Sequence, residues 1–415
     1  MLLDALMAAT DRLIITYTGN DERTNIARPA AVPVGELLDM ADRTARVEGM
    51  RVRDHVLVKH PLQPFDPRNY EPGRLVDGKP WSFDHVTLAG ARALATDRPK
   101  PRAFLDAPLP GSPATVLELE DLARFLSTPV GAFLGQRLAV SVADRSSEPA
   151  DALPVEVEGL DRWRIGDRML TARLAGVSMD DAVAAEVARG ELPPGSLADV
   201  TIAEVRPIVE EIVARAGQAQ TASVDVRVVL DDGRRVSGTV PHVAGTVLRA
   251  VGYSRVGARQ RIGAWVRLVA LCAAYPDRAY EAVIVGRGSG GVKVVKLPTL
   301  SAQDARAELA ILADLYDRGM CEPLPIACAP TAAYAEAVRD KRDPEDAARR
   351  DWESEWNFDK EDVKPEHQLA FDGVLTFEEL LARPLRDGED WGTGETTRFG
   401  RLSRRLWDRL LVHEA

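Results

Sequence analysis

Three short apolar runs followed by a helical run constrain the fold of this chain more than any other feature. The runs read VDVRVVL, RRVSGTVPHV and TVLRAVGYSRV, and the helical pattern covers residues 259–274. β-Branched residues alternating with polar ones predict strands, whereas apolar residues spaced three and four apart predict a helix. We therefore expect a mixed sheet flanked by helices, in an α/β (α+β) fold.

The same order of strands and helix forms the active site of a large class of metal-dependent nucleases. Those enzymes carry carboxylates at the ends of the second and third strands, where this chain has Pro241 and then Gly252 and Ser254. Two-metal cleavage of a phosphodiester needs about three or four oxygen ligands and a nearby lysine. Pro241, Gly252 and Ser254 are thus degenerate positions, and we expect a nuclease framework with no catalytic residues and no metal site.

Two other functions remain open. A nuclease with relocated ligands would use Asp225, Asp231 or Glu281, although Asp231 falls in the turn between the first two strands. A protein-interaction module would instead dock through the charged stretch 339–362 and through the C-terminal helix. We expect that stretch to be a solvated helix or loop, with Trp352 and Trp356 as the anchors that hold it to the chain.

The chain has no motif for a phosphate-binding cofactor of its own. Gly286, Gly288 and Gly291 are spaced as GxGxxG, but the sequence continues as VKVVKL, which alternates like a strand. A phosphate loop requires a helix at that point. We expect a glycine-rich β-hairpin there, and no cofactor in this chain.

The charge limits the ways in which the chain can bind DNA. With 53 basic and 64 acidic side chains the net charge is −11, which disfavours a free-standing, non-specific DNA binder. A local basic surface can still contact DNA. The candidate contacts are His242, Arg249, Tyr253 and Arg255, for which salt bridges and strand-end packing are an equally good explanation.

The pattern along the chain predicts three regions: a strand-and-helix remnant over residues 1–50, a proline-rich ordered connector over 51–114, and the sheet domain over 115–415. In the first, DRLIITY (11–17) predicts a buried strand and VGELLDMAD (34–42) a helix. In the third, a helical stretch over 160–188 precedes a long helix ending at Ala216. Ser301 is the expected N-cap of a helix over 302–317.

The final helix is predicted to be amphipathic. Its apolar stripe and its basic cluster consist of Phe399, Leu402, Leu406 and Leu410, and of Arg398, Arg401, Arg404, Arg405 and Arg409. We expect the apolar stripe to be packed and the basic face solvated. Acidic residues just before the helix are available to pair with the cluster: Glu389, Asp390 and Glu395.

The predicted location is the cytoplasm, without membrane contact. No apolar stretch reaches the ~20 residues needed to span a bilayer. The three cysteines, an odd number without metal-ligand spacing, suit a reducing compartment.

Five segments carry a family resemblance that extends from near residue 11 to the end. They are RLIITYTGN, HPLQPFDPRNYEPG, FLSTPVGAFLGQRLAV, ARGELPPGSLADV and RFGRLSRRLWDRLL. With them the chain resembles the C-terminal portion of the RecC family, the gamma subunits of exodeoxyribonuclease V in the RecBCD helicase–nuclease. HPLQPFDPRNYEPG is the most specific of the five.

The resemblance implies a restriction-endonuclease-like (PD-(D/E)xK) domain without catalytic residues over 115–415, preceded by the tail of an inactivated helicase-like domain over 1–50. It implies a non-catalytic DNA-handling and scaffolding subunit for repair of double-strand breaks by homologous recombination. Such a subunit separates and channels strands, and in some members scans for a regulatory sequence. The implied partners are RecB-like and RecD-like subunits and double- and single-stranded DNA, with ATP and magnesium used by the partner subunits.

Overall fold

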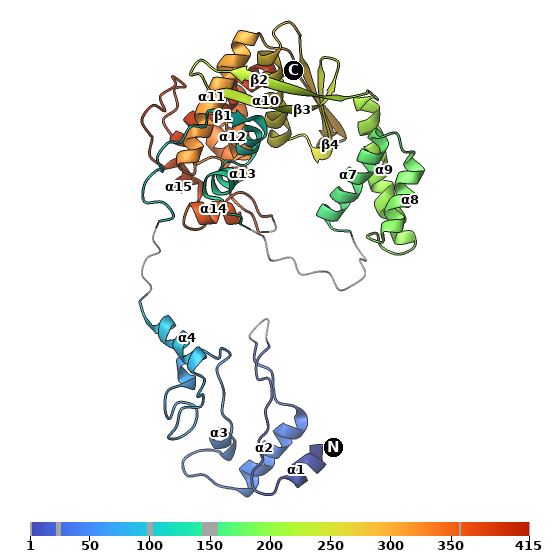
Figure 1. The fold of residues 1–415 in the computed structure, drawn as a ribbon. Coiled ribbons are helices and arrows are strands. Elements are labelled where there is room, and N and C mark those ends of the chain that lie inside the picture. Colours follow the sequence, from blue (N-terminus) through green and yellow to red (C-terminus); the bar gives the residue numbers. More distant parts are fainter. Residues whose placement is uncertain (1, 22–25, 98–102, 143–156, 357, 415) are drawn as a thin grey trace. The chain divides into compact units, whose positions relative to one another are not determined.

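The computed structural model describes all residues except 1, 22–25, 98–102, 143–156, 357 and 415 (Figure 1). The chain forms two compact units, residues 1–101 and 102–415. Among the described residues, no helix has both the length and the apolar character needed to cross a membrane.

The first unit consists of short helices joined by extended segments. Its elements are α1 (Leu2–Ala8), α2 (Val32–Thr44), α3 (Val52–Val56), the 3-10 turn η1 (Pro67–Asn69) and α4 (His85–Ala95). The helix expected after Pro33 is confirmed by α2. The buried strand expected over 11–17 is wrong: the segment has no regular secondary structure and pairs with no described strand, and Ile14 is 84% exposed. β-Branched residues favour a strand only where a neighbouring strand pairs with it, and the described part of this unit offers none.

The motif HPLQPFDPRNYEPG is ordered by hydrogen bonds to its own backbone. Asn69 Nδ2 donates to the carbonyls of Gln63 and Pro64, each at 3.2 Å, and the Tyr70 hydroxyl donates to Pro64 O at 2.9 Å. Asp66 accepts from Arg68 N at the start of η1. These contacts close a compact loop around η1, and they order a segment whose prolines cannot donate backbone hydrogen bonds.

The second unit contains a sheet and thirteen helical segments among its described residues. Its strands are β1 (Val116–Glu118), β2 (Ala222–Val229), β3 (Arg235–Ala244), β4 (Val247–Arg255), β5 (Glu281–Arg287) and β6 (Val292–Leu297). Its helices up to β5 are α5 (Leu119–Ser127), α6 (Pro129–Ala132), the π-helical turn η2 (Phe133–Arg137), α7 (Gly159–Leu174), α8 (Met179–Arg189), α9 (Ser196–Ala216) and α10 (Ala258–Ala274). After β6 come α11 (Ala302–Cys321), α12 (Cys328–Arg339), α13 (Pro344–Trp352), α14 (Pro365–Ala370), α15 (Phe377–Leu381) and α16 (Arg398–His413).

The mixed sheet predicted from the sequence is confirmed. The long strand β3 pairs antiparallel with β2 along most of its length and parallel with β1 near its start. It pairs with β4 only through Val243–Leu248 and Ala244–Val247. The sheet continues with β5, parallel to β4, and with β6, antiparallel to β5. The last pair is the expected glycine-rich hairpin, so GxGxxG is not a phosphate loop here.

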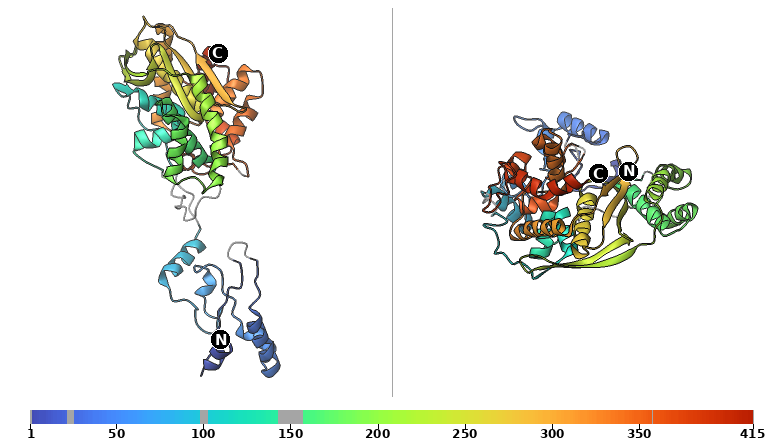
Figure 2. Two further views of the ribbon diagram at one scale, coloured as in Figure 1. Left: turned by 90° about the vertical axis from the view of Figure 1, so that its right-hand side faces the viewer. Right: turned by 90° about the horizontal axis from the view of Figure 1, so that it is seen from above.

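Helices cover both faces of the sheet in two separate cores (Figure 2). The larger core surrounds α10, of which eleven residues are buried, and includes α5, α11, α12 and α16. The smaller core packs α7, α8 and α9 against β4 and β5 (Figure 1). A Cβ on Gly166 of α7 would lie 2.2 Å from the ring of Tyr253, so this glycine permits the close approach of helix and strand.

Local signals account for several of the helix starts. N-cap side chains accept hydrogen bonds from the backbone of the first turn at Ser178, Ser301, Asp343, Thr376 and Thr397. The cap predicted at Ser301 is among them. The single helical stretch expected over 160–188 is instead two helices, because Gly176 (φ +90°) ends α7 and Ser178 begins α8.

The final helix is built largely as predicted. Its apolar stripe is buried, with Phe399 and Leu402 at 0% exposure. The basic cluster pairs with the preceding acidic residues through Arg398–Glu389, Arg404–Glu395 and Arg401–Asp390. Arg398 departs from the expected solvated face, since only 4% of its side chain is exposed.

The two tryptophans expected as anchors have opposite environments. Trp352, the last residue of α13, is completely buried. Trp356 is 98% exposed, so its role as an anchor within this chain is wrong. On a helix, residues four positions apart lie on the same face. Trp356 follows the end of α13 in an irregular loop, so it does not share the buried environment of Trp352.

Buried Glu308 makes the stability of the second unit depend on pH. Burial raises the pKa of its carboxyl, while a hydrogen bond from Trp265 Nε1 (3.0 Å) and the charge of Arg409 act in the opposite direction. A raised pKa means that the folded state binds the proton more tightly than the unfolded state. The stability that Glu308 contributes is therefore fully present below its ordinary pKa of 4.5 and lost as pH rises through the folded value.

Glu308→Gln keeps the acceptor for Trp265 and removes the titration. Its free energy of unfolding relative to the wild type should rise between pH about 5 and about 8. Urea unfolding at the two pH values measures this difference. An equal difference in unfolding free energy between variant and wild type at both pH values would show that the pKa of Glu308 is not raised.

Candidate functional site

A cleft of about 440 Å³ opens where β3 and β4 separate. The two strands bond to each other only beside their connecting turn, and beyond Val243 and Leu248 they diverge. Helix α10 lines the space between them. The lining residues are Pro241, His242, Leu248, Arg249, Ala250, Val251, Gly252, Ser254, Val256, Arg259, Gln260, Gly263, Ala264, Arg267 and Val285.

A β-bulge in β3 forms one wall of the cleft. The register between β2 and β3 shifts between Ala222–Val243 and Val224–Val240. Pro241 within this bulge has no N–H to donate to a ladder, and His242 adopts the left-handed conformation with φ +60°. The bulge brings two successive residues, Pro241 and His242, to the cleft.

A second irregularity, in β4, forms the opposite wall. The register with β5 shifts between Val251 and Arg255, and this segment contains Gly252 and Ser254. Gly286 of β5 makes the close approach possible, because a Cβ there would lie 2.6 Å from Ser254 O and 3.0 Å from Gly252 O. Trp163 Nε1 of α7 donates to Ser254 Oγ at 3.1 Å and so secures this wall to the smaller core.

The lining carries three arginines and no carboxylate. Arg249 donates to the carbonyls of Ala216 and Gly217 at the end of α9, at 2.7 and 2.5 Å. Arg267 pairs with Glu120 of α5 at 2.7 Å. Arg259 is exposed and forms no hydrogen bond or ion pair with the described residues. The cleft is therefore locally cationic in a chain of net charge −11.

The structure brings together five of the residues singled out from the sequence: Pro241, His242, Arg249, Gly252 and Ser254. Tyr253 is not among the lining residues and is 1% exposed. Its ring packs against α7, with the Arg287 guanidinium 4.7 Å from the ring centroid, and burial raises the pKa of its hydroxyl. In this structure its ring is covered by protein. Arg255 is exposed but lies outside the cleft lining.

The carboxylates considered as relocated metal ligands do not meet. Asp225 Oδ1 accepts from Thr239 Oγ1 at 2.6 Å on β2, Asp231 lies in the turn before β3, and Glu281 begins β5. None of the three lines the cleft. Within the described part of the chain, no group of three or more His, Cys, Asp or Glu side chains is placed to hold a metal ion.

Two of the cleft arginines were missed from the sequence. Arg259, Gly263 and Arg267 stand four residues apart on α10, so they share one helix face. That spacing is readable in ARQRIGAWVRL. Only the structure shows that this face points toward the divergent strands.

Comparison with known proteins identifies the family. The family model described as "RecC C-terminal domain" matches residues 114–339, which include the sheet and the cleft. The RecBCD enzyme subunit RecC of Mycobacterium tuberculosis is 41% identical over 419 residues, covering the whole of this chain. The chain belongs to the RecC family. The recognition made from the five segments is thus confirmed.

Other RecC proteins are similar over much of the chain. The RecBCD enzyme subunit RecC of Mycolicibacterium smegmatis is 39% identical over 422 residues, again the whole chain. That of Escherichia coli is 26% identical over 339 residues, covering 78% of this chain. The chain spans 38% of the length of its two mycobacterial relatives and corresponds to a C-terminal RecC-like portion.

Proposed function

We propose that this chain is part of a non-catalytic DNA-handling and scaffolding subunit of a RecBCD-type helicase–nuclease. The family name indicates a RecBCD subunit, consistent with DNA repair by recombination. In this proposal the subunit assembles in the cytoplasm with RecB-like and RecD-like partners, which use the ATP and magnesium. Its tasks are strand separation, channelling of single strands and, in some complexes, recognition of a regulatory sequence.

The proposal assigns a restriction-endonuclease-like framework to residues 115–415. The order β2, β3, β4, α10, β5 in a mixed sheet, with the cleft between the central strands and α10, supports this assignment. Residues 1–50 would be the tail of the inactivated helicase-like domain, and 51–114 the connector. These regions would supply shape to the complex rather than chemistry.

One observation carries the non-catalytic part of the proposal: the cleft is lined by Arg249, Arg259 and Arg267 and by no carboxylate. Magnesium requires hard oxygen ligands, and arginine repels a cation. The same arginines suit a phosphodiester backbone. The cleft is therefore better suited to hold a nucleic acid than to cut it.

A docking role for the stretch 339–362 is a second element of the proposal. Trp356 is 98% exposed and Phe358 is 67% exposed, both beyond the end of α13. Aromatic side chains are enriched at the centres of protein interfaces. Their exposure favours contact with a partner subunit, alongside DNA handling by the cleft.

Cleavage of labelled single-stranded DNA by the purified 415-residue chain tests the proposal. With magnesium or manganese present we expect no cutting above that of an Asp225→Ala variant purified identically, and no heat of metal binding in calorimetry. The variant separates contaminating nuclease from intrinsic activity. Metal-dependent cutting that Asp225→Ala or Glu281→Ala abolishes would establish the relocated-ligand nuclease instead.

A further inference from the structure

We infer that the cleft between β3, β4 and α10 binds the sugar-phosphate backbone of a single-stranded nucleic acid, with Arg259 and Arg267 contacting phosphates. The inference rests on the proposed function, because it names the surface with which a DNA-handling subunit would hold a strand. The two can be tested separately, because a DNA-handling subunit could bind DNA at a surface other than this cleft.

The electrostatics of the cleft set it apart from the rest of the molecule. Acidic side chains outnumber basic ones by 64 to 53, yet the three charged residues of the lining are all arginines. Arg259 has no carboxylate partner among the described residues. Arg249 donates only to backbone carbonyls, so no acid neutralises its charge. A polyanion entering the cleft would meet uncompensated positive charge.

The backbone at the start of α10 adds N–H groups to the positive charge of the arginine side chains. This helix has 17 residues, begins after Gly257 and has no acidic residue in its first turn. Val256, Arg259 and Gln260, which surround that start, all line the cleft. The unbonded N–H groups and the positive end of a helix dipole favour phosphate at such a place. Arg259 is thus positioned where the backbone itself already attracts an anion.

Arg267 lies two turns further along the same face of α10. Its partner Glu120 is 66% exposed, so this ion pair is weak and can exchange for a phosphate. Arg259 and Arg267 are eight residues apart, about 12 Å along the helix axis. At about 3.4 Å per nucleotide along one strand, this separation spans roughly three to four nucleotides, and fewer on a more extended strand.

The dimensions of the cleft favour a single strand. Its volume of about 440 Å³ is that of a small-ligand site. A nucleotide or two fits in such a space, whereas a duplex does not. The shared chemistry, a phosphodiester chain, is present in both DNA and RNA.

Fluorescence anisotropy with labelled oligo(dT) tests the inference on the 415-residue chain. For single strands, each phosphate contact adds about 0.7 to the slope of log K against log salt, equivalent to about fivefold in affinity at ~0.1 M salt. Arg259→Ala and Arg267→Ala should each lower the affinity about fivefold and reduce the slope by about 0.7. The double variant should lose roughly 25-fold.

Arg306→Ala is the matched control. Arg306 is an exposed arginine of α11 outside the cleft lining, and it forms no hydrogen bond or ion pair with the described residues. Its removal changes the net charge by the same amount, and affinity should be unchanged. Far-UV circular dichroism of each variant verifies that the fold is retained.

The possible results separate this inference from the proposed function. Binding of oligo(dT) that Arg259→Ala and Arg267→Ala leave intact would overturn the cleft site while leaving DNA handling in place. Absence of any binding, even at low salt, would overturn both. Equal affinity for oligo(U) would support a backbone site that accepts either nucleic acid, and equal affinity for an oligoglutamate peptide would overturn specificity for phosphodiesters.

Discussion

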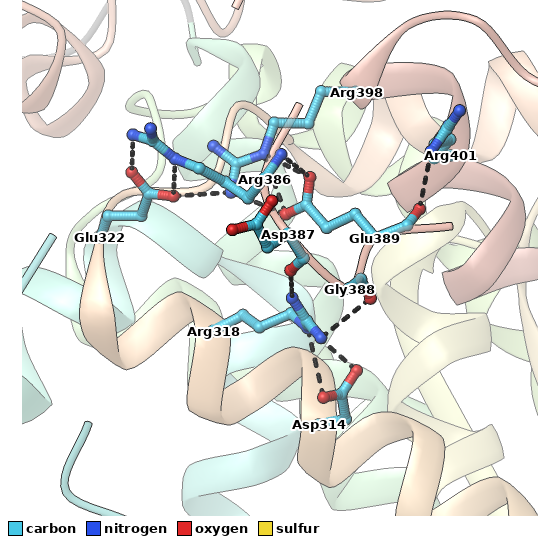
Figure 3. A network of polar contacts seen from close by, with 9 residues as sticks. All are labelled: Asp314, Arg318, Glu322, Arg386, Asp387, Gly388, Glu389, Arg398 and Arg401. Atoms are coloured by element: carbon cyan, nitrogen blue, oxygen red, sulfur yellow. Dashed lines mark hydrogen bonds and ion pairs between the residues drawn. The ribbon is translucent and has the colours of Figure 1, made fainter. Parts of the chain in front are cut away.

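Replacing Glu389 by alanine should lower the free energy of unfolding of the second unit by about 3–5 kcal/mol, because it leaves a buried arginine without its main partner. The Glu389 side chain is completely buried and that of Arg398 is 4% exposed. Arg398 Nε donates to both carboxylate oxygens of Glu389, at 3.0 and 2.9 Å (Figure 3). We expect this to be one of the two largest losses among single substitutions considered for this chain.

The pair belongs to a network that joins α11 and α16 to the loop between α15 and α16. Glu322, just after α11, accepts from Arg398 at 2.7 Å and from Arg386 at 2.9 and 2.7 Å (Figure 3). Glu389 also accepts from the backbone N–H of Arg386 at 3.0 Å. Truncating Glu389 thus leaves donors unsatisfied on both Arg398 and Arg386.

Urea unfolding followed by circular dichroism measures the loss. Glu389→Gln retains one acceptor oxygen and the side-chain volume, so it should fall between the wild type and Glu389→Ala. Asp346→Ala breaks the exposed pair Asp346–Arg350 and should leave the unfolding midpoint nearly unchanged. A Glu389→Ala midpoint equal to that of Asp346→Ala would contradict the assigned role of the network.

Trp352→Ala should also cost about 3–5 kcal/mol of unfolding free energy. The side chain is completely buried, its ring stacks on His367 with centroids 5.2 Å apart, and its Nε1 donates to Leu375 O at 2.7 Å. The substitution creates a cavity and removes the donor to a buried carbonyl. Both effects act on the segment that connects α13, α14 and α15.

Trp356→Ala provides the comparison within the same charged run. Trp356 is 98% exposed, so its loss should leave the unfolding midpoint almost unchanged while weakening any contact with a partner subunit. Urea unfolding curves of Trp352→Ala and Trp356→Ala, measured under the same conditions, test whether burial accounts for the difference. Similar midpoints for both would show that burial of Trp352 contributes little.

Elements that depend on neighbouring residues in the chain were predictable from the sequence. The strands β2 to β6, the helix α10 and the N-cap at Ser301 follow from periodicity and from local hydrogen-bonding chemistry. Two other elements depend instead on residues far away in the chain. The strand β1 was not expected, because three residues give no pattern, and it exists through its pairing with β3. The strand expected over 11–17 has the pattern but no partner in the described residues.

The candidate site also contains residues that were predictable from the sequence and residues that only long-range packing places there. Pro241, Gly252 and Ser254 were picked out by their order along two predicted strands, and the structure places all three in one cleft. Tyr253 lies between two cleft residues along β4, and it faces the other core because successive strand residues point to opposite faces. Arg259 and Arg267 join the cleft from α10, whose orientation depends on packing against the sheet.

By itself the sequence determined the family, the strand and helix order, and the non-acidic residues Pro241, Gly252 and Ser254 along two of the strands. These properties follow from residue identity and from spacing along the chain, so they can be predicted without knowing which distant residues are in contact. Only the tertiary structure decided that β3 and β4 diverge, that Arg249, Arg259 and Arg267 converge on the resulting cleft, and that Trp352 is buried while Trp356 is exposed. Each of these depends on bulges, long-range packing and burial, which arise from residues far apart in the chain.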